Sequence, residues 1–334
     1  MYNLPRNTCI YKLAGTETFR SSSTEFLGHG TNLQNVPKEL RHLYWADEGK
    51  ILVQVDQSGA EALIVAYLCD YGRFRELFLH NVKPHVFVAM NVFLDKWKIH
   101  CKDIDLAAFV STPIPQLQLK EGWKILDSII KESDDWAAHE RYYYIAKMIC
   151  HAANYGMRGA ALQMNVLEKS RGQIVLTKQQ AENYLMGYHA LFPELSRWHR
   201  WVTKQLQDQK VLYNLFGFPR ILTGRFDEND AKEWFAFCPQ STVGCITHIA
   251  VAALQRYIES AGRDWDILGN CHDSYLAQCP IGEEVELGAK MKEFIEQELT
   301  NFRGEKFRMR SAAQAGYNWG PFKEIKNEEG LKAL

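Results

Sequence analysis

Three side chains of unlike chemistry recur at every fourth position between residues 141 and 156. On a helix, Lys147, His151 and Tyr155 would share one face, because residues four apart lie one above the other. A buried stripe would instead carry Leu, Ile or Val. A cation, an imidazole and a phenol indicate a surface that binds an anion at one end and a planar group further along, as a nucleotide requires. From this segment alone, a solvated helix with chance spacing is an equal alternative.

Two aspartates stand where predicted strands end. A short β-branched strand is predicted to end at Asp56, directly before a helix that starts near Ser58. A later segment is predicted to form a hairpin that turns close to Gly269 and carries His272 and Asp273 on its second strand. Carboxylates on neighbouring strands could hold two divalent metal ions for phosphoryl transfer. A single strand-end aspartate is more often a turn or cap residue.

Together these segments resemble, in order and spacing, the motifs of the family A DNA polymerases, the DNA polymerase I type. The resemblance extends roughly from residue 19 to residue 275. In chain order, Arg20–Ser23 matches an arginine turn, Thr31–Pro37 a template-side signature, and Asp56–Glu61 the first palm motif. Further along, Lys147–Gly156 matches the fingers helix, Lys232–Gln240 a primer-template helix, and His272–Asp273 the second palm motif. A compact chain that departs from the family pattern at some positions is similar to the phage members of the family.

The resemblance implies an α+β fold, the polymerase right hand with an antiparallel-sheet palm and helical fingers. Residues 1–80 would form the N-terminal part of the palm with the template-side signature, 81–230 the fingers, and 231–334 the C-terminal part of the palm. Only 19 residues precede Arg20, so we expect the family's thumb and a 3′-5′ exonuclease to be absent from this chain. The connection over 94–137 is longer than the family needs and receives no function.

The resemblance also implies template-directed addition of dNTPs to a primer 3′-hydroxyl by two-metal nucleotidyl transfer, without a proofreading domain. Asp56 and Asp273, helped by the Gln57 carbonyl, would ligate two Mg²⁺ ions. Lys147 would neutralise charge on the leaving pyrophosphate and is a candidate proton donor to it. The residues expected at the dNTP are Ser58, Glu61, His85, Lys147, His151 and Tyr155. Those expected at the primer-template DNA are Arg20, Asn32, Gln34, Lys232, Gln240 and His272.

Three positions depart from the family pattern. Tyr143 stands where the family has an arginine four residues before the fingers lysine, and the nearest arginine is Arg141. His151 replaces a Phe or Tyr at the middle of the fingers face. The usual His-Asp-Glu ends here in Ser274, as in the single-subunit RNA polymerases of the phage type.

Two alternative functions follow from these departures. The first is a single-subunit RNA polymerase core, which shares this palm. Glu61 argues against it. In the DNA enzymes that the chain resembles, a glutamate at this position packs against the fingers tyrosine, here Tyr155, and crowds the sugar 2′ position, whereas RNA polymerases have a small residue there. The second is a non-catalytic DNA-binding or assembly subunit with a polymerase fold. Retention of two facing carboxylates argues against this one, since their repulsion costs stability unless a metal is bound.

Composition fits a large globular enzyme. Of 334 residues, 46% are hydrophobic and 12% aromatic, enough for a substantial core. The formal net charge is only −1, whereas a self-sufficient DNA binder is usually basic. Besides primer-template DNA and dNTPs, we therefore expect a separately encoded thumb, processivity or exonuclease subunit as a partner. Eight cysteines without a C-x-x-C pair indicate reduced thiols and no zinc site. Without a leader or a stretch of about 20 apolar residues, we expect a cytoplasmic protein, of a bacterial host if phage-encoded.

Overall fold

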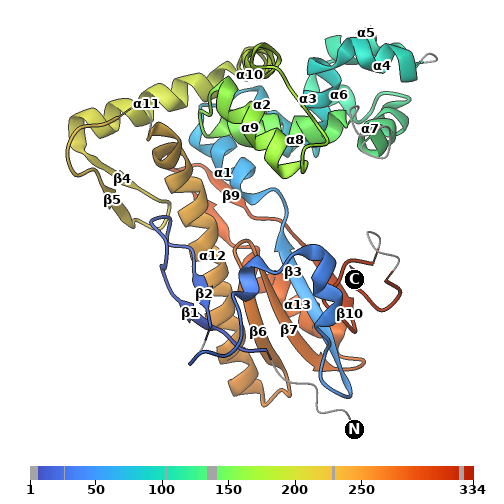
Figure 1. Cartoon of the computed structure of the whole chain (residues 1–334), viewed down its shortest axis with the longest axis vertical. Helices are drawn as coiled ribbons and strands as arrows, with labels where there is room; N and C mark the ends of the chain where they lie inside the picture. The colour runs from blue at the N-terminus through green and yellow to red at the C-terminus, as the bar shows by residue number, and fades with distance from the viewer. Residues whose placement is uncertain (1–6, 26, 102–103, 134–140, 228–229, 323–326) are drawn as a thin grey trace. The chain divides into compact units, whose positions relative to one another are not determined.

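The computed structural model of the chain is shown in Figure 1. It combines helices with antiparallel strands, and so confirms the predicted α+β class. The residues that the structure describes are 7–25, 27–101, 104–133, 141–227, 230–322 and 327–334.

The chain divides into two compact units, each discontinuous in sequence. Unit 1 comprises Met1–Glu61, Tyr213–Arg220 and Phe237–Leu334, and unit 2 comprises Ala62–Leu212 and Ile221–Ala236. Segments of unit 1 that are remote in sequence therefore fold together.

The limits of these units differ from the predicted limits at residues 80 and 230. The segment 62–80 belongs to the helical unit 2. The reason is visible at Phe74, which is fully buried and packs against the rings of Tyr188 and Phe192 within that unit. Burial of this ring commits its helix to the helical core.

Unit 1 is built on a five-stranded antiparallel sheet with strand order β11-β10-β3-β7-β6. Its strands are β3 (Lys50–Gln57), β6 (Asp266–Cys271), β7 (Ser274–Pro280), β10 (Ser311–Gly316) and β11 (Lys332–Ala333). The central strand β3 is rich in β-branched residues and buries Leu52, Val53 and Val55. Such residues pack well on a pleated surface that is covered on both faces.

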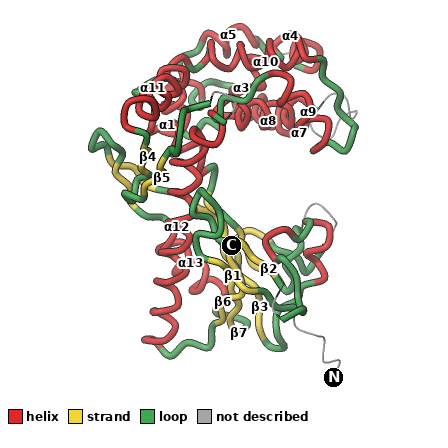
Figure 2. The backbone as a smooth tube through the Cα atoms, turned by 60° about the vertical axis from the view of Figure 1, so that its left-hand side comes forward, coloured by secondary structure: helices red, strands yellow, loops and turns green. Residues whose placement is uncertain are grey.

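Two helices cover one face of this sheet, α12 (Ala231–Ala261) and α13 (Glu284–Ile295). Both lie on the same side of the strands in Figure 2, and α13 packs against β3 and β10. On the opposite face, a buried cluster joins the sheet to the N-terminal and C-terminal segments; its members are Val36, Leu52, Leu276, Trp319 and Leu331. Because side chains alternate along a strand, the last residues of β3 point to different faces.

The remaining elements of unit 1 are short. They are β1 (Ile10–Lys12), β2 (Ser22–Thr24), β8 (Glu298–Thr300), β9 (Lys306–Arg308) and two 3₁₀ helices, η1 (Leu33–Asn35) and η2 (Lys38–Leu43). A two-stranded hairpin, β4 (Val211–Tyr213) and β5 (Pro219–Ile221), precedes α12.

Unit 2 is helical. Its helices are α1 (Ala60–Leu68), which begins at the unit boundary, α2 (Arg73–Leu79), α3 (Pro84–Val92), α4 (Leu94–His100), α5 (Leu106–Ser111), α6 (Ile114–Leu117), α7 (Trp123–Glu132), α8 (Tyr142–Asn154), α9 (Gly159–Lys169), α10 (Lys178–Leu191) and α11 (Pro193–Gln209). The long connection expected over 94–137 contains α4 to α7, and its residues 102–103 and 134–137 lie outside the described part. Helices α3 and α8 pack together, and α8 buries Ile145 and Ile149.

Among the described residues, one helix is long and apolar enough to cross a membrane, by length and composition alone. This is α12, whose most apolar 18-residue window has a mean hydropathy of 1.3. The sequence prediction of no such stretch was therefore too strict. However, 67% of that window is buried inside the protein, as in the core helix of a soluble domain.

Candidate active site

The two predicted carboxylates lie in adjoining segments of unit 1, Asp56 in β3 and Asp273 in the turn that precedes β7. Strands β3 and β7 pair antiparallel, with Asp56 opposite Ser274. The amide of Gln57 donates a hydrogen bond to the carbonyl oxygen of Asp273 at 3.0 Å. The structure thus brings Asp56 and Asp273 together at one end of the β3–β7 pair.

The turn that carries Asp273 differs from the prediction. Strand β6 ends at Cys271, which pairs with Ser274, so His272 and Asp273 are themselves the two-residue turn and not part of the second strand. His272 has φ 63°, the left-handed region that residues with a β-carbon rarely occupy. A two-residue hairpin requires such angles, and here a histidine adopts one.

The Gly269-Asn270 pair, predicted to turn, lies instead inside β6 at an irregularity in the register between Ile267 and Gly269. A β-carbon on Gly269 would lie 2.9 Å from the Tyr11 hydroxyl oxygen. That hydroxyl accepts a hydrogen bond from the Asn270 amide at 3.1 Å. The glycine therefore marks a bulge with a close approach, which is the other common meaning of glycine in a strand.

The surroundings of both carboxyl groups disfavour their negative charge and so raise their pKa values. Burial, followed by the charge of Asp273, raises the pKa of Asp56 to about 7, although Lys38 and Arg41 act in the opposite direction. Burial also raises the pKa of Asp273, against its own backbone amide and Arg20. Two half-desolvated carboxylates that repel each other would both ionise readily beside a divalent cation.

The donor set suits a hard cation. Carboxylate and carbonyl oxygens are the ligands that Mg²⁺ prefers, and it usually takes one or two protein carboxylates together with waters and substrate phosphates. Among the described residues, no group of three or more His, Cys, Asp and Glu side chains is arranged to hold a metal. A pair of aspartates is compatible with a magnesium site that the substrate completes.

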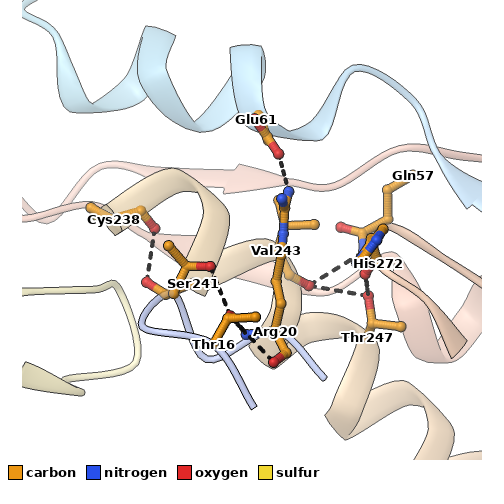
Figure 3. Close-up of polar contacts among 10 residues, drawn as sticks. Thr16, Arg20, Gln57, Glu61, Cys238, Ser241, Val243, Thr247 and His272 are labelled. Carbon is orange, nitrogen blue, oxygen red and sulfur yellow. Dashed lines mark hydrogen bonds and ion pairs between the residues drawn. The ribbon is translucent and has the colours of Figure 1, made fainter. Parts of the chain in front are cut away.

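Figure 3 shows an ion pair between Arg20 and Glu61. The charges of both residues act on the pKa of Asp273. The Arg20 guanidinium donates to Oε1 of Glu61, and both side chains are largely buried, with 19% and 24% exposed. Thr16 holds the Arg20 backbone by accepting from its amide at 3.1 Å. After burial, the charge of Arg20 is the next cause that lowers the pKa of His272. The residue expected to sense the sugar is therefore positioned by the arginine of the predicted arginine turn.

Asn32 and Gln34, which were expected on the template side, form hydrogen bonds within unit 1. Asn32 Oδ1 accepts from the Gln34 amide at 3.1 Å and from the Ser23 hydroxyl at 2.5 Å, and so caps η1. The buried Gln34 side chain donates to the Asn270 carbonyl at 3.0 Å. Gln34 thus fixes the N-terminal segment against the edge strand β6, whereas Asn32 holds η1 to β2.

In unit 2, helix α8 presents the predicted stripe. The Lys147 ammonium lies 4.1 Å from the centre of the Tyr143 ring, and the His85 ring is 6.2 Å from the same ring. Burial, followed by the charge of Lys147, lowers the pKa of His85 to about 4, so this imidazole is neutral at pH 7. His151 packs edge-on against Tyr155, which caps the helix, with ring centres 5.0 Å apart. The stripe is therefore a cation beside aromatic rings.

Sequence comparisons connect these features to known proteins. No family model matches the chain. The chain is 21% identical over 320 residues to the DNA polymerase I of Treponema pallidum (strain Nichols), covering 92% of this chain and 27% of that protein. It is 21% identical over 317 residues to the DNA polymerase I of Caldicellulosiruptor bescii, covering 91% and 31%. It is 25% identical over 158 residues to the DNA polymerase of Bacillus phage SP01, covering 44% and 17%.

These similarities support the resemblance to the family A DNA polymerases that the motifs indicate. The chain spans less than a third of the length of these relatives. The fold agrees with a solved structure, the POL domain of Pol1 from M. smegmatis in complex with DNA primer-template and dNTP. The TM-score is 0.67 at 19% identity, and the match covers 93% of this chain and 47% of that one.

The residues expected from the family A motifs divide between the two units. Unit 1 contains Arg20, Asn32, Gln34, Asp56, Gln57, Ser58, Glu61, Gln240, His272 and Asp273, and unit 2 contains His85, Lys147, His151, Tyr155 and Lys232. Ser58 and Lys232 are exposed, and Gln240 is half-buried in α12.

Sequence reasoning missed the contacts of two residues, Tyr143 in unit 2 and Thr247 in unit 1. Tyr143 was recognised only as a departure, although its ring supports the ammonium of Lys147. Thr247 was not singled out, although its hydroxyl lies 3.0 Å from the His272 carbonyl oxygen. The signal available in the sequence was a hydroxyl within a largely apolar stretch of an expected helix.

Proposed function

We propose that this chain is the core of a template-directed DNA polymerase of family A, which adds dNTPs to a primer 3′-hydroxyl. The observation that carries the proposal is the pair Asp56 and Asp273 at one end of β3 and β7, with pKa values raised by burial and, for Asp56, by mutual repulsion. In this proposal unit 1 is the palm and unit 2 is the fingers. Because the polymerase fold accounts for 93% of the chain, we assign no exonuclease to these residues.

Asp56, Asp273 and the Gln57 carbonyl would hold two Mg²⁺ ions. When bound, such ions activate the primer hydroxyl and stabilise charge on the departing pyrophosphate. The protein's own contribution is to keep the two carboxylates close and partly desolvated, so that they are ready to accept cations. The Gln57 amide, which donates to Asp273, fixes the spacing of the two chain segments.

We assign the triphosphate to the stripe on α8. Lys147 would neutralise phosphate charge and is the candidate proton donor to the leaving group. Tyr143 takes the place of the family's arginine and holds the lysine ammonium over its ring. His85, neutral at pH 7, can donate one hydrogen bond to a phosphate oxygen. His151 and Tyr155 offer flat surfaces for the sugar or a base.

We assign deoxynucleotide selection to Glu61, which Arg20 holds in place. Its bulk would exclude a 2′-hydroxyl, and this favours a DNA polymerase over the RNA polymerase alternative. Ser58 would contact the dNTP nearby in sequence. Arg20, His272, Asn32, Gln34, Gln240 and Lys232 would position the primer-template duplex.

We also propose an added subunit that improves DNA retention. The motive is the net charge of −1, since phosphate neutralisation by Lys and Arg supplies most non-specific affinity for DNA.

Template direction provides the direct test of the function. Purified chain, Mg²⁺ and one dNTP at a time are mixed with four primed templates that differ in the first template base. The proposal predicts extension only with the complementary dNTP and little with rNTPs. Extension by rNTPs in preference would favour the RNA polymerase alternative. DNA binding without extension at any metal or enzyme concentration would favour the non-catalytic alternative.

A further inference from the structure

A buried hydroxyl touches the neighbours of both candidate metal ligands (Figure 3). The side-chain amide of Gln57 donates to Thr247 Oγ1 at 2.8 Å, and this oxygen lies 3.0 Å from the His272 carbonyl oxygen. Gln57 follows Asp56 in β3, and His272 precedes Asp273 in the turn. Thr247 is fully buried in α12 and Gln57 is 2% exposed. One side chain of the helix therefore links the two segments that carry the carboxylates.

The direction of these bonds follows from the proton count. A hydroxyl has one proton to donate, and Thr247 accepts from Gln57. Two carbonyls lie within reach of its proton, that of His272 at 3.0 Å and that of Val243 at 3.1 Å. The Val243 carbonyl lies inside α12, where the amide of residue 247 is its regular partner. The His272 carbonyl lies in the turn, outside the strand ladder, so it gains more from the hydroxyl.

The bond to His272 acts on a peptide unit that needs support. His272 has φ 63°, a conformation that contacts from the surrounding structure must maintain. Its carbonyl belongs to the peptide that leads into Asp273. The Gln57 amide holds the next carbonyl, that of Asp273, at 3.0 Å. Thr247 and the β3 backbone thus fix the peptides on both sides of the Asp273 α-carbon.

We propose that Thr247 is a positioning residue for metal binding, which sets the direction of the Asp273 carboxylate and holds Gln57 beside Asp56. The proposal rests on the assignment of Asp56, Asp273 and the Gln57 carbonyl as metal ligands in the proposed function. Thr247 itself contacts neither metal nor substrate.

Three variants separate positioning from simple stability. Thr247→Val removes the hydroxyl and Thr247→Ser restores it. Thr242→Val is the matched control, because Thr242 is also fully buried in α12 but its hydroxyl accepts from the Leu215 amide at 3.3 Å. Binding of Mn²⁺ to the DNA-free protein is measured from the loss of the free-ion electron paramagnetic resonance signal. Folding of each variant is checked by thermal melting.

We expect Thr247→Val to weaken Mn²⁺ binding about tenfold, the effect typical of a group that orients a metal ligand. Thr247→Ser should bind as the unchanged protein does, and Thr242→Val should melt at a lower temperature with unchanged Mn²⁺ affinity. Unchanged affinity in Thr247→Val would overturn the proposal, as would an equal loss in Thr242→Val. If Thr247→Val does not fold, the smaller Thr247→Ala takes its place with the same expectations.

Primer extension gives a second, separate result. The Mg²⁺ concentration for half-maximal rate should rise about tenfold in Thr247→Val, with most of the rate recovered at saturating Mg²⁺. A lower rate at every Mg²⁺ concentration, with an unchanged half-maximal point, would contradict positioning of a metal ligand. If the unchanged protein does not extend primers, the proposed function fails, whereas the Mn²⁺ measurements still decide the role of Thr247.

Discussion

At the scale of single residues, the charges of the Asp56 and Asp273 carboxylates lower the stability of the metal-free protein. A carboxyl group whose pKa is raised in the folded state binds its proton more tightly there than in the unfolded chain. For Asp56 the window runs from its ordinary value near 4 to about 7. Below this window the group costs nothing, and its cost grows as the pH rises and is complete above pH 7. Bound cations would offset that cost, which would explain why two repelling carboxylates lie close together.

Asp56→Asn should therefore stabilise the metal-free protein at pH 8, by about 1 to 3 kcal/mol, because an amide has no charge to desolvate. The gain should vanish near pH 4. Denaturant unfolding in EDTA at both pH values measures this. Asp95→Asn, at an exposed carboxylate on α4, is the control and should have little effect. If Asp56→Asn changes the free energy of unfolding equally at pH 8 and at pH 4, the charge of Asp56 does not destabilise the folded protein.

Glu61→Ala should relax sugar discrimination. The ratio of dNTP to rNTP incorporation is expected to fall by about tenfold or more, since excluding one small group is worth roughly 1–3 kcal/mol. Glu61→Gln keeps the bulk but loses the ion pair with Arg20. If bulk is the gate, Glu61→Gln retains most of the discrimination. Equal ratios in Glu61→Ala and the unchanged protein would remove Glu61 from this role.

At the scale of elements, the turn between β6 and β7 carries Asp273 and depends on close packing around β6. Gly269→Ala should destabilise unit 1 by about 1 to 3 kcal/mol, because its β-carbon would meet the Tyr11 hydroxyl at 2.9 Å. Thermal or denaturant unfolding measures the change. Combining it with Tyr11→Phe, which removes that oxygen, should cost less than the sum of the two single changes. Strict additivity would contradict the clash.

The success of sequence reasoning differed between elements. Strand β3 and the stripe on α8 were predictable, because β-branched residues and a four-residue spacing are local signals. The β6–β7 turn was misplaced, because Gly-Asn is a strong turn signal and the sequence does not reveal that Tyr11 approaches this glycine. The roles of Thr247 and Tyr143 depend on contacts between separate elements. No local pattern encodes such contacts.

At the scale of the whole molecule, two units with different contents share one chain. Unit 1 contains the carboxylates and unit 2 contains the cationic stripe. The formal charge of −1 gives little general attraction for DNA phosphates. In the proposed function, local side chains and an added subunit would hold the duplex.

The purified chain alone should release DNA after a few additions. Product length per binding event is measured on a long primed template with a trap for free enzyme. Addition of a co-purifying subunit should lengthen the products, and raising the salt concentration should shorten them. Extension over hundreds of nucleotides by the chain alone would rule out a required partner.

The central claim is that Asp56 and Asp273 form the metal site of nucleotidyl transfer. Its most direct test is the rate of single-nucleotide incorporation, with enzyme in excess over primed template, for Asp273→Asn, Asp95→Asn and the unchanged protein. Loss of a metal ligand at the reacting centre should lower the rate by at least about 10³-fold, with DNA affinity kept. Asp95→Asn should react at the rate of the unchanged protein. Incorporation by Asp273→Asn within a few-fold of that rate would contradict the account.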